Sequence, residues 1–200
     1  MSKIFCLNKT TGFMEQEVKN TFEALKSGKT ILYPTDTIWG LGCDATNEEA
    51  VNNIYTIKKR EDSKSLIILI ADIGQLRDYV AQIPDIAWDI VDFAEKPLTV
   101  IYPKGKNVAK NILNEDGSIA VRFTKDDFCR KLIQKLRSPI VSTSANVSGM
   151  PSPKSFSEIS EEIKTNAGYI VNHRQNEKNN VPPSTIIKLE MNGEIKFIRK

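Results

Sequence analysis

Short runs of apolar and β-branched residues alternate along this chain with longer stretches in which apolar residues return every three or four positions. The short runs predict buried strands, and the longer stretches predict helices that turn one face to a core. Such alternation is typical of an α/β or α+β fold, with helices packed on a sheet. The runs predict strands at residues 4–7, 30–33, 66–70, 98–102, 118–123, 140–143, 185–189 and 195–199.

Three helices are indicated by periodicity or by a favourable first residue. Residues 15–26 and 126–136 each carry one apolar stripe at helical spacing. Asn47, followed by two glutamates, predicts a helix start, because its amide oxygen can cap the first turn and the carboxylates favour the positive end of the helix dipole. We expect that helix to reach Lys58.

The last third of the chain predicts one more helix and a loop. Ser155 with Glu158 three positions later has the form of a capping box, which predicts that a helix opens there. Residues 173–183 are polar and end in two prolines, which predicts a long loop. Because no internal repeat and no long charge block divides the chain, we expect residues 1–200 to form a single domain.

Composition narrows the class of protein. Of the 200 residues, 40% are hydrophobic and 26% are charged, as in soluble globular proteins. A net charge of +3, from 28 basic and 25 acidic residues, is too small to argue for nucleic-acid or membrane binding. The three cysteines are widely spaced and favour a reducing compartment. Since no apolar run has membrane-spanning length, we expect a cytoplasmic protein without membrane contact.

The first candidate for chemistry is the stretch TILYPTDTIWGLGCD at residues 30–44. A predicted strand ends here in Thr35, Asp36 and Thr37, and two glycines follow at 40 and 42. Glycine permits positive φ and lets the backbone approach a ligand closely. The stretch therefore predicts one wall of a small-molecule site.

A second stretch of similar form spans residues 139–153, again directly after a predicted strand. Its polar residues and glycine are Ser142, Thr143, Ser144, Asn146, Ser148, Gly149 and Ser152. An ordinary turn, in which such side chains bond local backbone groups, is the alternative interpretation. The repetition of strand, hydroxyls and glycine favours a second wall of the same site, and Pro183-Ser184-Thr185 is a weaker third instance.

Cations near these stretches point to an anionic ligand. Lys58, Arg60 and Lys64 follow the helix that begins at Asn47. They could simply lie in solvent and complement the negative end of the helix dipole. Alternatively, Lys58 and Arg60 form a phosphate clamp, in which arginine supplies a fork of donors and lysine a compact charge.

Three other kinds of site are not supported by the sequence, namely a P-loop, a serine-hydrolase active site and a metal site. Residues 27–30 contain the GKT of a P-loop, but Glu23 occupies the position of its first glycine, and the segment follows a helix instead of a strand. Ser144 is not in a G-x-S-x-G elbow, which argues against a serine hydrolase. Histidine and cysteine lack metal-ligand spacing, so we predict no metal bound by the protein itself.

Five motifs resemble those of the YrdC-like threonylcarbamoyl-AMP synthase family, in its short single-domain form. They are YPTDTIWGLGCDA at 33–45, K-x-R at 58–60, SIAVRF at 118–123, STSANVSGMPSP at 142–153 and PST at 183–185. Together they cover nearly the whole chain in family order. The resemblance implies a twisted mixed β-sheet with flanking helices around a positive concave cavity.

The resemblance also implies an activity: a nucleotidyltransferase that joins L-threonine, bicarbonate or CO2, and ATP into threonylcarbamoyl-AMP and pyrophosphate. ATP is then a substrate, with Mg2+ carried by the nucleotide. The product serves the t6A modification of tRNA adenosine 37, which implies a downstream tRNA t6A transfer machinery as partner. Contact with tRNA or double-stranded RNA is a further expectation of this kind.

Site residues follow from the same resemblance, position by position. Those expected to hold L-threonine are Thr35, Thr37, Arg122, Ser142 and Ser184. Those expected around ATP are Lys58, Arg60, Lys64, Ser118, Ser144, Asn146, Ser152 and Arg199. The catalytic set implied is Lys58, Arg60, Ser144 and Asn146. Family members usually continue with prolines after K-x-R, where this chain reads REDSKS, so the loop over the phosphates has a different sequence here.

Two other functions remain open at this point. One is an RNA-binding translation or ribosome-assembly factor, because a positive cavity can also hold a phosphodiester backbone. The chain lacks the signature motifs of common RNA-binding folds, and RNA binding would weaken steeply with salt. The other is a paralogue with the same fold and a different nucleotide-dependent activity.

Overall fold

The computed structural model describes residues 2–59, 66–177 and 181–200, with side chains from residue 12 onward. Within these ranges the helices are α1 Ser2–Lys26, α2 Glu48–Lys58, α3 Leu76–Tyr79, α4 Ile86–Asp92, α5 Asp127–Leu136 and α6 Glu161–Asn166. The strands are β1 Ile31–Tyr33, β2 Gly40–Gly42, β3 Ile67–Ile70, β4 Leu98–Tyr102, β5 Ile119–Phe123, β6 Ile140–Ser144, β7 Tyr169–Ile170, β8 Thr185–Leu189 and β9 Ile195–Arg199.

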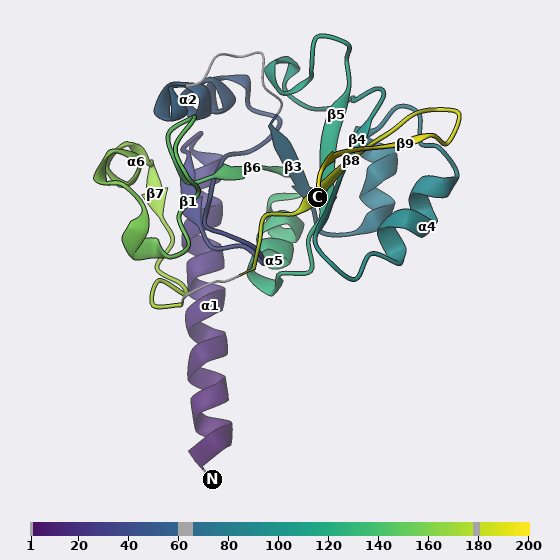
Figure 1. Ribbon diagram of the computed structural model, residues 1–200. Coiled ribbons are helices and arrows are strands. Elements are labelled where there is room, and N and C mark those ends of the chain that lie inside the picture. The colour runs from purple at the N-terminus through teal and green to yellow at the C-terminus, as the bar shows by residue number, and fades with distance from the viewer. Residues whose placement is uncertain (1, 60–65, 178–180) are drawn as a thin grey trace.

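In the described part of the chain, the nine strands form one mixed sheet in the order β7-β1-β2-β6-β3-β5-β4-β8-β9 (Figure 1). Three neighbouring pairs are parallel, namely β1 with β7, β3 with β5, and β4 with β8, and the other pairs are antiparallel. The end of β6 pairs with β2, and its beginning pairs with β3. Strand β6 therefore joins two parts of the sheet and brings the two hydroxyl-rich stretches of the sequence side by side.

Successive side chains of a strand point to opposite faces of the sheet, so the apolar side chains of β3 pack into two different cores. Ile68 and Ile70 of β3 pack with α2 and α4 in one core, whereas Leu69 between them packs with α1 and α5 in another. Successive side chains of a strand point to opposite faces, so both faces of β3 are covered along part of its length. The part of the sheet that these helices leave uncovered is where a cavity lies.

Helix α2 forms as its sequence predicts. Asn47 accepts a hydrogen bond from the backbone N–H of Ala50 at 3.0 Å, and two glutamates occupy the first turn. The helix ends at Lys59, whose φ of 49° is left-handed and closes the last turn. This termination places Lys58 in the last turn, where its side chain is buried against β6.

Two predictions of secondary structure are wrong. Residues 4–7 lie in α1, because a strand of four residues needs a neighbouring strand, whereas a helix that already spans 15–26 extends by one local hydrogen bond per residue. Ser155 opens only a 3₁₀ turn at Phe156–Glu158, and its side chain caps nothing. Ser160 caps the following helix, α6, by accepting from the backbone N–H of Ile163 at 3.4 Å.

The remaining predicted helices and strands are present, with boundaries that differ by one or two residues, except that α1 begins earlier. The loop predicted at 173–183 contains no helix or strand in its described residues. Strand β2 was not predicted, because a strand of Gly40, Leu41 and Gly42 has neither alternation nor β-branched residues. Strand β7 and the short helices α3 and α4 were not predicted either. A search of the described residues finds no helix long and apolar enough to cross a membrane.

Candidate active site

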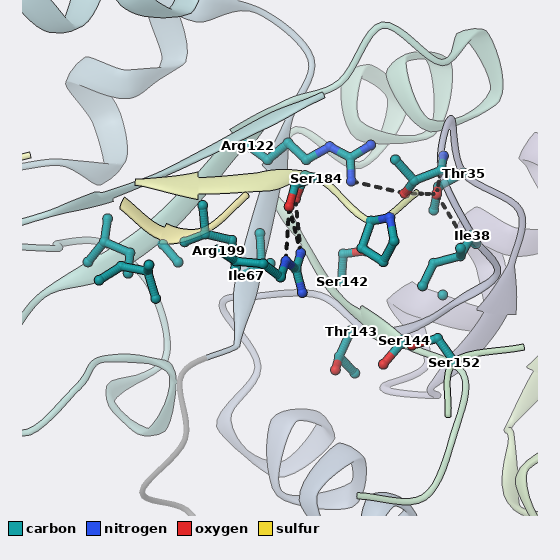
Figure 2. Close-up of a pocket in the computed structure, with 17 residues that line it drawn as sticks. Thr35, Ile38, Ile67, Arg122, Ser142, Thr143, Ser144, Ser152, Ser184 and Arg199 are labelled. Atoms are coloured by element: carbon teal, nitrogen blue, oxygen red, sulfur yellow. Dashed lines mark hydrogen bonds between the residues drawn. The ribbon is translucent and has the colours of Figure 1, made fainter. Parts of the chain in front are cut away.

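A cavity of about 530 Å³ opens on the uncovered part of the sheet (Figure 2). Its wall is made by residues from β2, β3, β4, β5, β6, β8 and β9 and by the turns at 35–38, 152 and 183–184. The lining residues are Thr35, Thr37, Ile38, Gly40, Ile67, Ile101, Ala120, Arg122, Ser142, Thr143, Ser144, Ser152, Pro183, Ser184, Ile186, Ile198 and Arg199. The wall therefore combines hydroxyls, two guanidinium groups and an apolar floor of isoleucines.

Strand register explains why residues distant in sequence meet here. Ile67 of β3 lies opposite Ala120 of β5 and Ser142 of β6, so these three side chains point to the same face. Arg122, two residues after Ala120 on β5 and therefore on the same face, lies opposite Thr99 of β4. The sheet thus brings a hydroxyl, an apolar floor and a buried cation to one surface.

The turn at 35–38 is held in shape by its own threonines. The hydroxyl of Thr35 donates to the carbonyl of Ile38 at 2.7 Å and accepts from the backbone N–H of Thr37 at 3.1 Å. The hydroxyl of Thr37 accepts from Nη1 of Arg122 at 3.2 Å. Both threonines are buried, so this side of the cavity is formed before any ligand arrives.

Arg122 is the buried cation of the site. Its side chain is 6% exposed, and Nη2 forms an ion pair with Oδ1 of Asp36. Burial raises the pKa of the Asp36 carboxyl, Arg122 opposes that rise, and the nearby Asp126 adds to it. Nε of Arg122 is buried and has no hydrogen-bond partner among the described residues. Nη1, beside the cavity-lining Thr37, carries a second N–H that can donate to a further acceptor.

Ser184 and Arg199 form the opposite side of the cavity, on β8 and β9 and the segment before them. The hydroxyls of Ser184 and Thr99 are 2.8 Å apart, and Arg199 donates from Nε and Nη2 to the carbonyl of Ser184 at 3.1 and 2.8 Å. Burial lowers the pKa of Arg199, and the positive charge of Arg122 lowers it further. The two guanidinium groups are thus close enough to interact, which favours an anionic ligand between them.

The side chain of Lys58 contacts the backbone of the cavity wall on the side away from the cavity. Its Nζ donates to the carbonyls of Ser144 and Asn146, both at 2.6 Å, and its own carbonyl accepts from the backbone N–H of Ser148 at 2.9 Å. The side-chain amide of Asn146 donates to the carbonyl of Met150 and, at 3.1 Å, to that of Val147. These bonds tie the end of α2 to the loop after β6.

The structure brings together most of the residues expected at the site. All five expected to hold L-threonine line the cavity, and so do three of those expected around ATP, namely Ser144, Ser152 and Arg199. Lys58 and Asn146 touch the wall through the loop at 144–150 without lining it among the described residues. Arg60 and Lys64 lie outside the described residues.

Ser118 lies elsewhere. It is buried just before β5, where its hydroxyl accepts from the side-chain amide of Asn114 at 2.7 Å and its backbone N–H donates to Asp116 at 2.9 Å. It does not appear in the described lining of the cavity, because the turn at 114–118 directs it to these local partners.

Gly40 and Gly42 were expected to adopt positive φ and to let a ligand approach the backbone. The structure gives Gly42 a different role. Neither Gly40 nor Gly42 has positive φ. A Cβ on Gly42 would lie 2.3 Å from the carbonyl oxygen of Val141 and 2.8 Å from the ring of Tyr33. The glycine is needed so that β2, β6 and that ring can pack closely, and the approach of a ligand does not require it.

Asp36 is a site residue that the residue-by-residue resemblance did not assign. The signal was present, since a carboxylate between two threonines stood directly after a buried strand. Its partner could not be found from sequence, because Arg122 lies on a distant strand. The isoleucines of the floor were likewise expected only as strand residues.

Comparison with known proteins gives consistent matches. The Sua5/YciO/YrdC family model, which carries the description "Telomere recombination", matches residues 23–200. The chain is 38% identical over 174 residues to a threonylcarbamoyl-AMP synthase of Pseudoalteromonas translucida, covering 86% of this chain and 91% of the relative. It is 35% identical over 193 residues to a putative threonylcarbamoyl-AMP synthase of Methanocaldococcus jannaschii, covering 94% of this chain and 86% of the relative.

Solved structures agree with these matches. P. abyssi Sua5 complexed with L-threonine superposes with a TM-score of 0.79 at 32% identity, covering 86% of this chain and 50% of Sua5. The chain therefore spans about half the length of that protein. E. coli YciO superposes with a TM-score of 0.78 at 22% identity, covering 92% of this chain and 88% of YciO, which shows the shared fold.

Proposed function

This chain belongs to the Sua5/YciO/YrdC family, and from that membership we propose that it is a threonylcarbamoyl-AMP synthase. The proposed reaction consumes L-threonine, bicarbonate or CO2, and ATP, and it releases threonylcarbamoyl-AMP and pyrophosphate. The observation that supports it most directly is the wall around Arg122, where a buried guanidinium and several hydroxyls surround a cavity of small-molecule size.

We name the amino-acid end of the cavity as the part lined by Thr35, Thr37, Arg122, Ser142 and Ser184. A free amino acid carries a carboxylate, and a guanidinium is a strong partner for that group. Hydroxyls on both sides suit the polar side chain and the amine. The structure of P. abyssi Sua5 complexed with L-threonine, at 32% identity, supports L-threonine as the amino acid in this proposal.

We name the nucleotide end as the part formed by Ser144, Ser152 and Arg199 with Lys58 and Asn146 behind the wall. Arg60 and Lys64 join this end in the proposal on the family motif alone, whereas Ser118, which bonds Asn114 and Asp116 in its own turn, is left out of it. Cations and hydroxyls here would neutralise the phosphates of ATP, and the isoleucine floor would accept its apolar surfaces.

The proposed mechanism needs no nucleophile from the protein. The neutral amine of L-threonine adds to CO2 and loses a proton, which gives a carbamate, and a carbamate oxygen then attacks the α-phosphorus of ATP. The bond from that phosphorus to the bridging oxygen breaks, and pyrophosphate leaves with Mg2+, which enters with the nucleotide. The protein holds the reactants in line, excludes water and stabilises negative charge, with Lys58 and Arg60 as the proposed cations at the phosphates.

The product is a mixed anhydride that water destroys, so it must be consumed soon after release. We propose that a tRNA t6A transfer machinery receives it, in agreement with the family's role in modifying adenosine 37. Direct contact with tRNA is a finer proposal, and the net charge of +3 does not by itself support it.

The test is a mass-spectrometric assay of the purified chain with ATP, Mg2+, L-threonine and bicarbonate, leaving out each in turn. Threonylcarbamoyl-AMP and pyrophosphate should form only in the complete mixture. Failure to form product in a folded protein that still binds ATP would contradict the proposal and favour a paralogue of different activity. Steep loss of RNA binding with salt, without product formation, would instead favour the RNA-binding factor.

A further inference from the structure

Two cavities lie on either side of one ion pair. Arg122 lines the cavity of about 530 Å³, whereas its partner Asp36 lines a smaller cavity of about 210 Å³ beside Leu98, Phe123 and Lys125. Asp36 is not among the described residues that line the larger cavity. Its carboxylate therefore reaches the guanidinium from outside that cavity, and does not stand where a ligand would lie.

The guanidinium of Arg122 has a donor that its protein partners do not use. Nη1 donates to Thr37 and Nη2 pairs with Asp36, and each of these nitrogens carries a second N–H. Because Thr37 and Arg122 both line the larger cavity, the second N–H of Nη1 can donate to a ligand there. A carboxylate oxygen suits this role, because carboxylate and guanidinium match in charge and geometry.

A second nearby carboxylate is committed elsewhere. Oδ1 of Asp126 accepts from the backbone N–H of Cys129 at 2.9 Å, and Oδ2 pairs with Nη1 of Arg174 at 2.6 Å. In the part of the chain that the structure describes, Asp36 is thus the carboxylate that compensates the charge of Arg122. A buried cation without such a partner would be strongly unfavourable.

We propose that Asp36 is a positioning residue, which holds the guanidinium of Arg122 from behind so that its Nη1 edge faces the carboxylate of the amino-acid substrate. This inference rests on the proposed function, because it takes an amino acid as the ligand. Without Asp36, the long side chain of Arg122 can adopt other rotamers, and affinity falls for ligands that carry a carboxylate.

Calorimetry on the full chain with two ligands tests this role. L-threonine carries the carboxylate, and L-threoninol replaces it with an alcohol. Asp36→Asn should weaken L-threonine binding about tenfold, as expected when one charge-assisted contact is misplaced, and leave the affinity for L-threoninol unchanged. Asp89→Asn, at an exposed aspartate of α4, is the matched control and should change neither affinity.

Steady-state kinetics give a second readout. The KM for L-threonine should rise in Asp36→Asn while kcat stays within about threefold, because the substrate carboxylate takes no part in the bonds that form and break and its contact acts as uniform binding. Asp36→Glu keeps the charge but moves it by one methylene, and should lose L-threonine affinity less than Asp36→Asn does. It serves as the alternative variant if Asp36→Asn fails to fold.

Several outcomes would overturn the positioning role. Unchanged L-threonine affinity in folded Asp36→Asn and Asp36→Glu would exclude it, and tighter binding would show that Asp36 competes with the substrate. If Asp36→Asn weakens the affinity for L-threonine and for L-threoninol equally, then Asp36 only stabilises the structure of the site. A parent protein that binds ATP but not L-threonine would instead refute the proposed function, which separates the two failures.

Discussion

The amino-acid end and the nucleotide end of the cavity are stabilised by different kinds of contact. At the amino-acid end, side chains bond one another, as Arg122 of β5 does with Asp36 and Thr37 of the turn at 35–38. At the nucleotide end, side chains bond backbone carbonyls, as Lys58 does with Ser144 and Asn146. Both kinds of bond satisfy buried polar groups, but they constrain different parts of the chain.

The two ends are therefore sensitive to substitution in different ways. The contacts of Arg122 with the turn at 35–38 depend on the order and register of the strands that hold β5 and this turn in place. Contacts from a side chain to a loop carbonyl determine the path of the loop itself. A substitution at the amino-acid end should therefore change a ligand contact, whereas one at the nucleotide end should also move backbone.

The largest effect is expected at the amino-acid end. Arg122→Ala leaves the Asp36 carboxylate partly buried without its partner, and should lower the free energy of unfolding by about 3–5 kcal/mol in urea denaturation. Calorimetry should show L-threonine binding weakened by roughly a hundredfold, because the charge-assisted contact with the substrate carboxylate is lost. Adding Asp36→Asn should recover part of the stability but none of the binding. Near-parental L-threonine binding in Arg122→Ala would refute the assignment of this end.

At the nucleotide end, Lys58→Ala should raise the barrier to adenylate formation by about 2–4 kcal/mol, measured as the rate of pyrophosphate release. L-threonine binding should stay close to that of the parent, because Lys58 contacts the loop after β6 and not the turn at 35–38. Equal loss of L-threonine binding would show that the two ends are not independent.

Lys59→Ala is the matched control for that experiment. Its Nζ pairs with Glu162 at 2.6 Å, but the side chain is 63% exposed. An exposed ion pair contributes little, so stability should change by less than about 1 kcal/mol and the rate of adenylate formation should not change.

Gly42→Ala should affect both ends together. Its Cβ would meet the carbonyl of Val141 at 2.3 Å, so β2 and β6 must separate, and we expect a loss of about 1–3 kcal/mol in urea denaturation. Binding of both L-threonine and ATP should weaken, because β6 contributes Ser142 to one end and Ser144 to the other.

The control is Gly193→Ala in the turn between β8 and β9, where φ is +83° and nothing lies within 4 Å of the added Cβ. It should cost about 1–2 kcal/mol of backbone strain without changing either affinity.

The smallest effect is a pH dependence near the amino-acid end. Burial lowers the pKa of His173 below its usual 6.5, and the charge of Arg174 lowers it further. The unfolded chain therefore binds the proton more tightly, so the free energy of unfolding should fall as the pH drops below about 6.5. His173 is the one histidine of the chain, and His173→Gln should reduce this slope in urea denaturation between pH 7.5 and 5.5.

Asp36 acts in the opposite direction, because burial raises its pKa and the folded state then gains relative stability as the pH falls. Asp36→Asn should therefore make the acid loss of stability steeper. If His173→Gln leaves the slope unchanged, the imidazole does not titrate differently in the folded and unfolded states.

Most of the helices and strands could be predicted from local sequence. Asn47 and the two glutamates after it marked the start of α2, and the apolar stripe at 126–136 predicted α5. Prediction from local sequence failed where a segment suits two kinds of secondary structure. Residues 4–7 suit either a strand or a helix, and only the absence of a pairing strand in the described sheet decides for the helix.

Local sequence establishes which groups are available: hydroxyls after two strands, a cation in line with a third, and cations after a helix. Which of these groups meet depends on the fold. Asp36 pairs with Arg122, 86 positions away, and Lys58 reaches Ser144 at the same separation. Such contacts follow from strand order, register and helix packing, which emerge from burying the whole apolar surface at once and leave no local mark in the sequence.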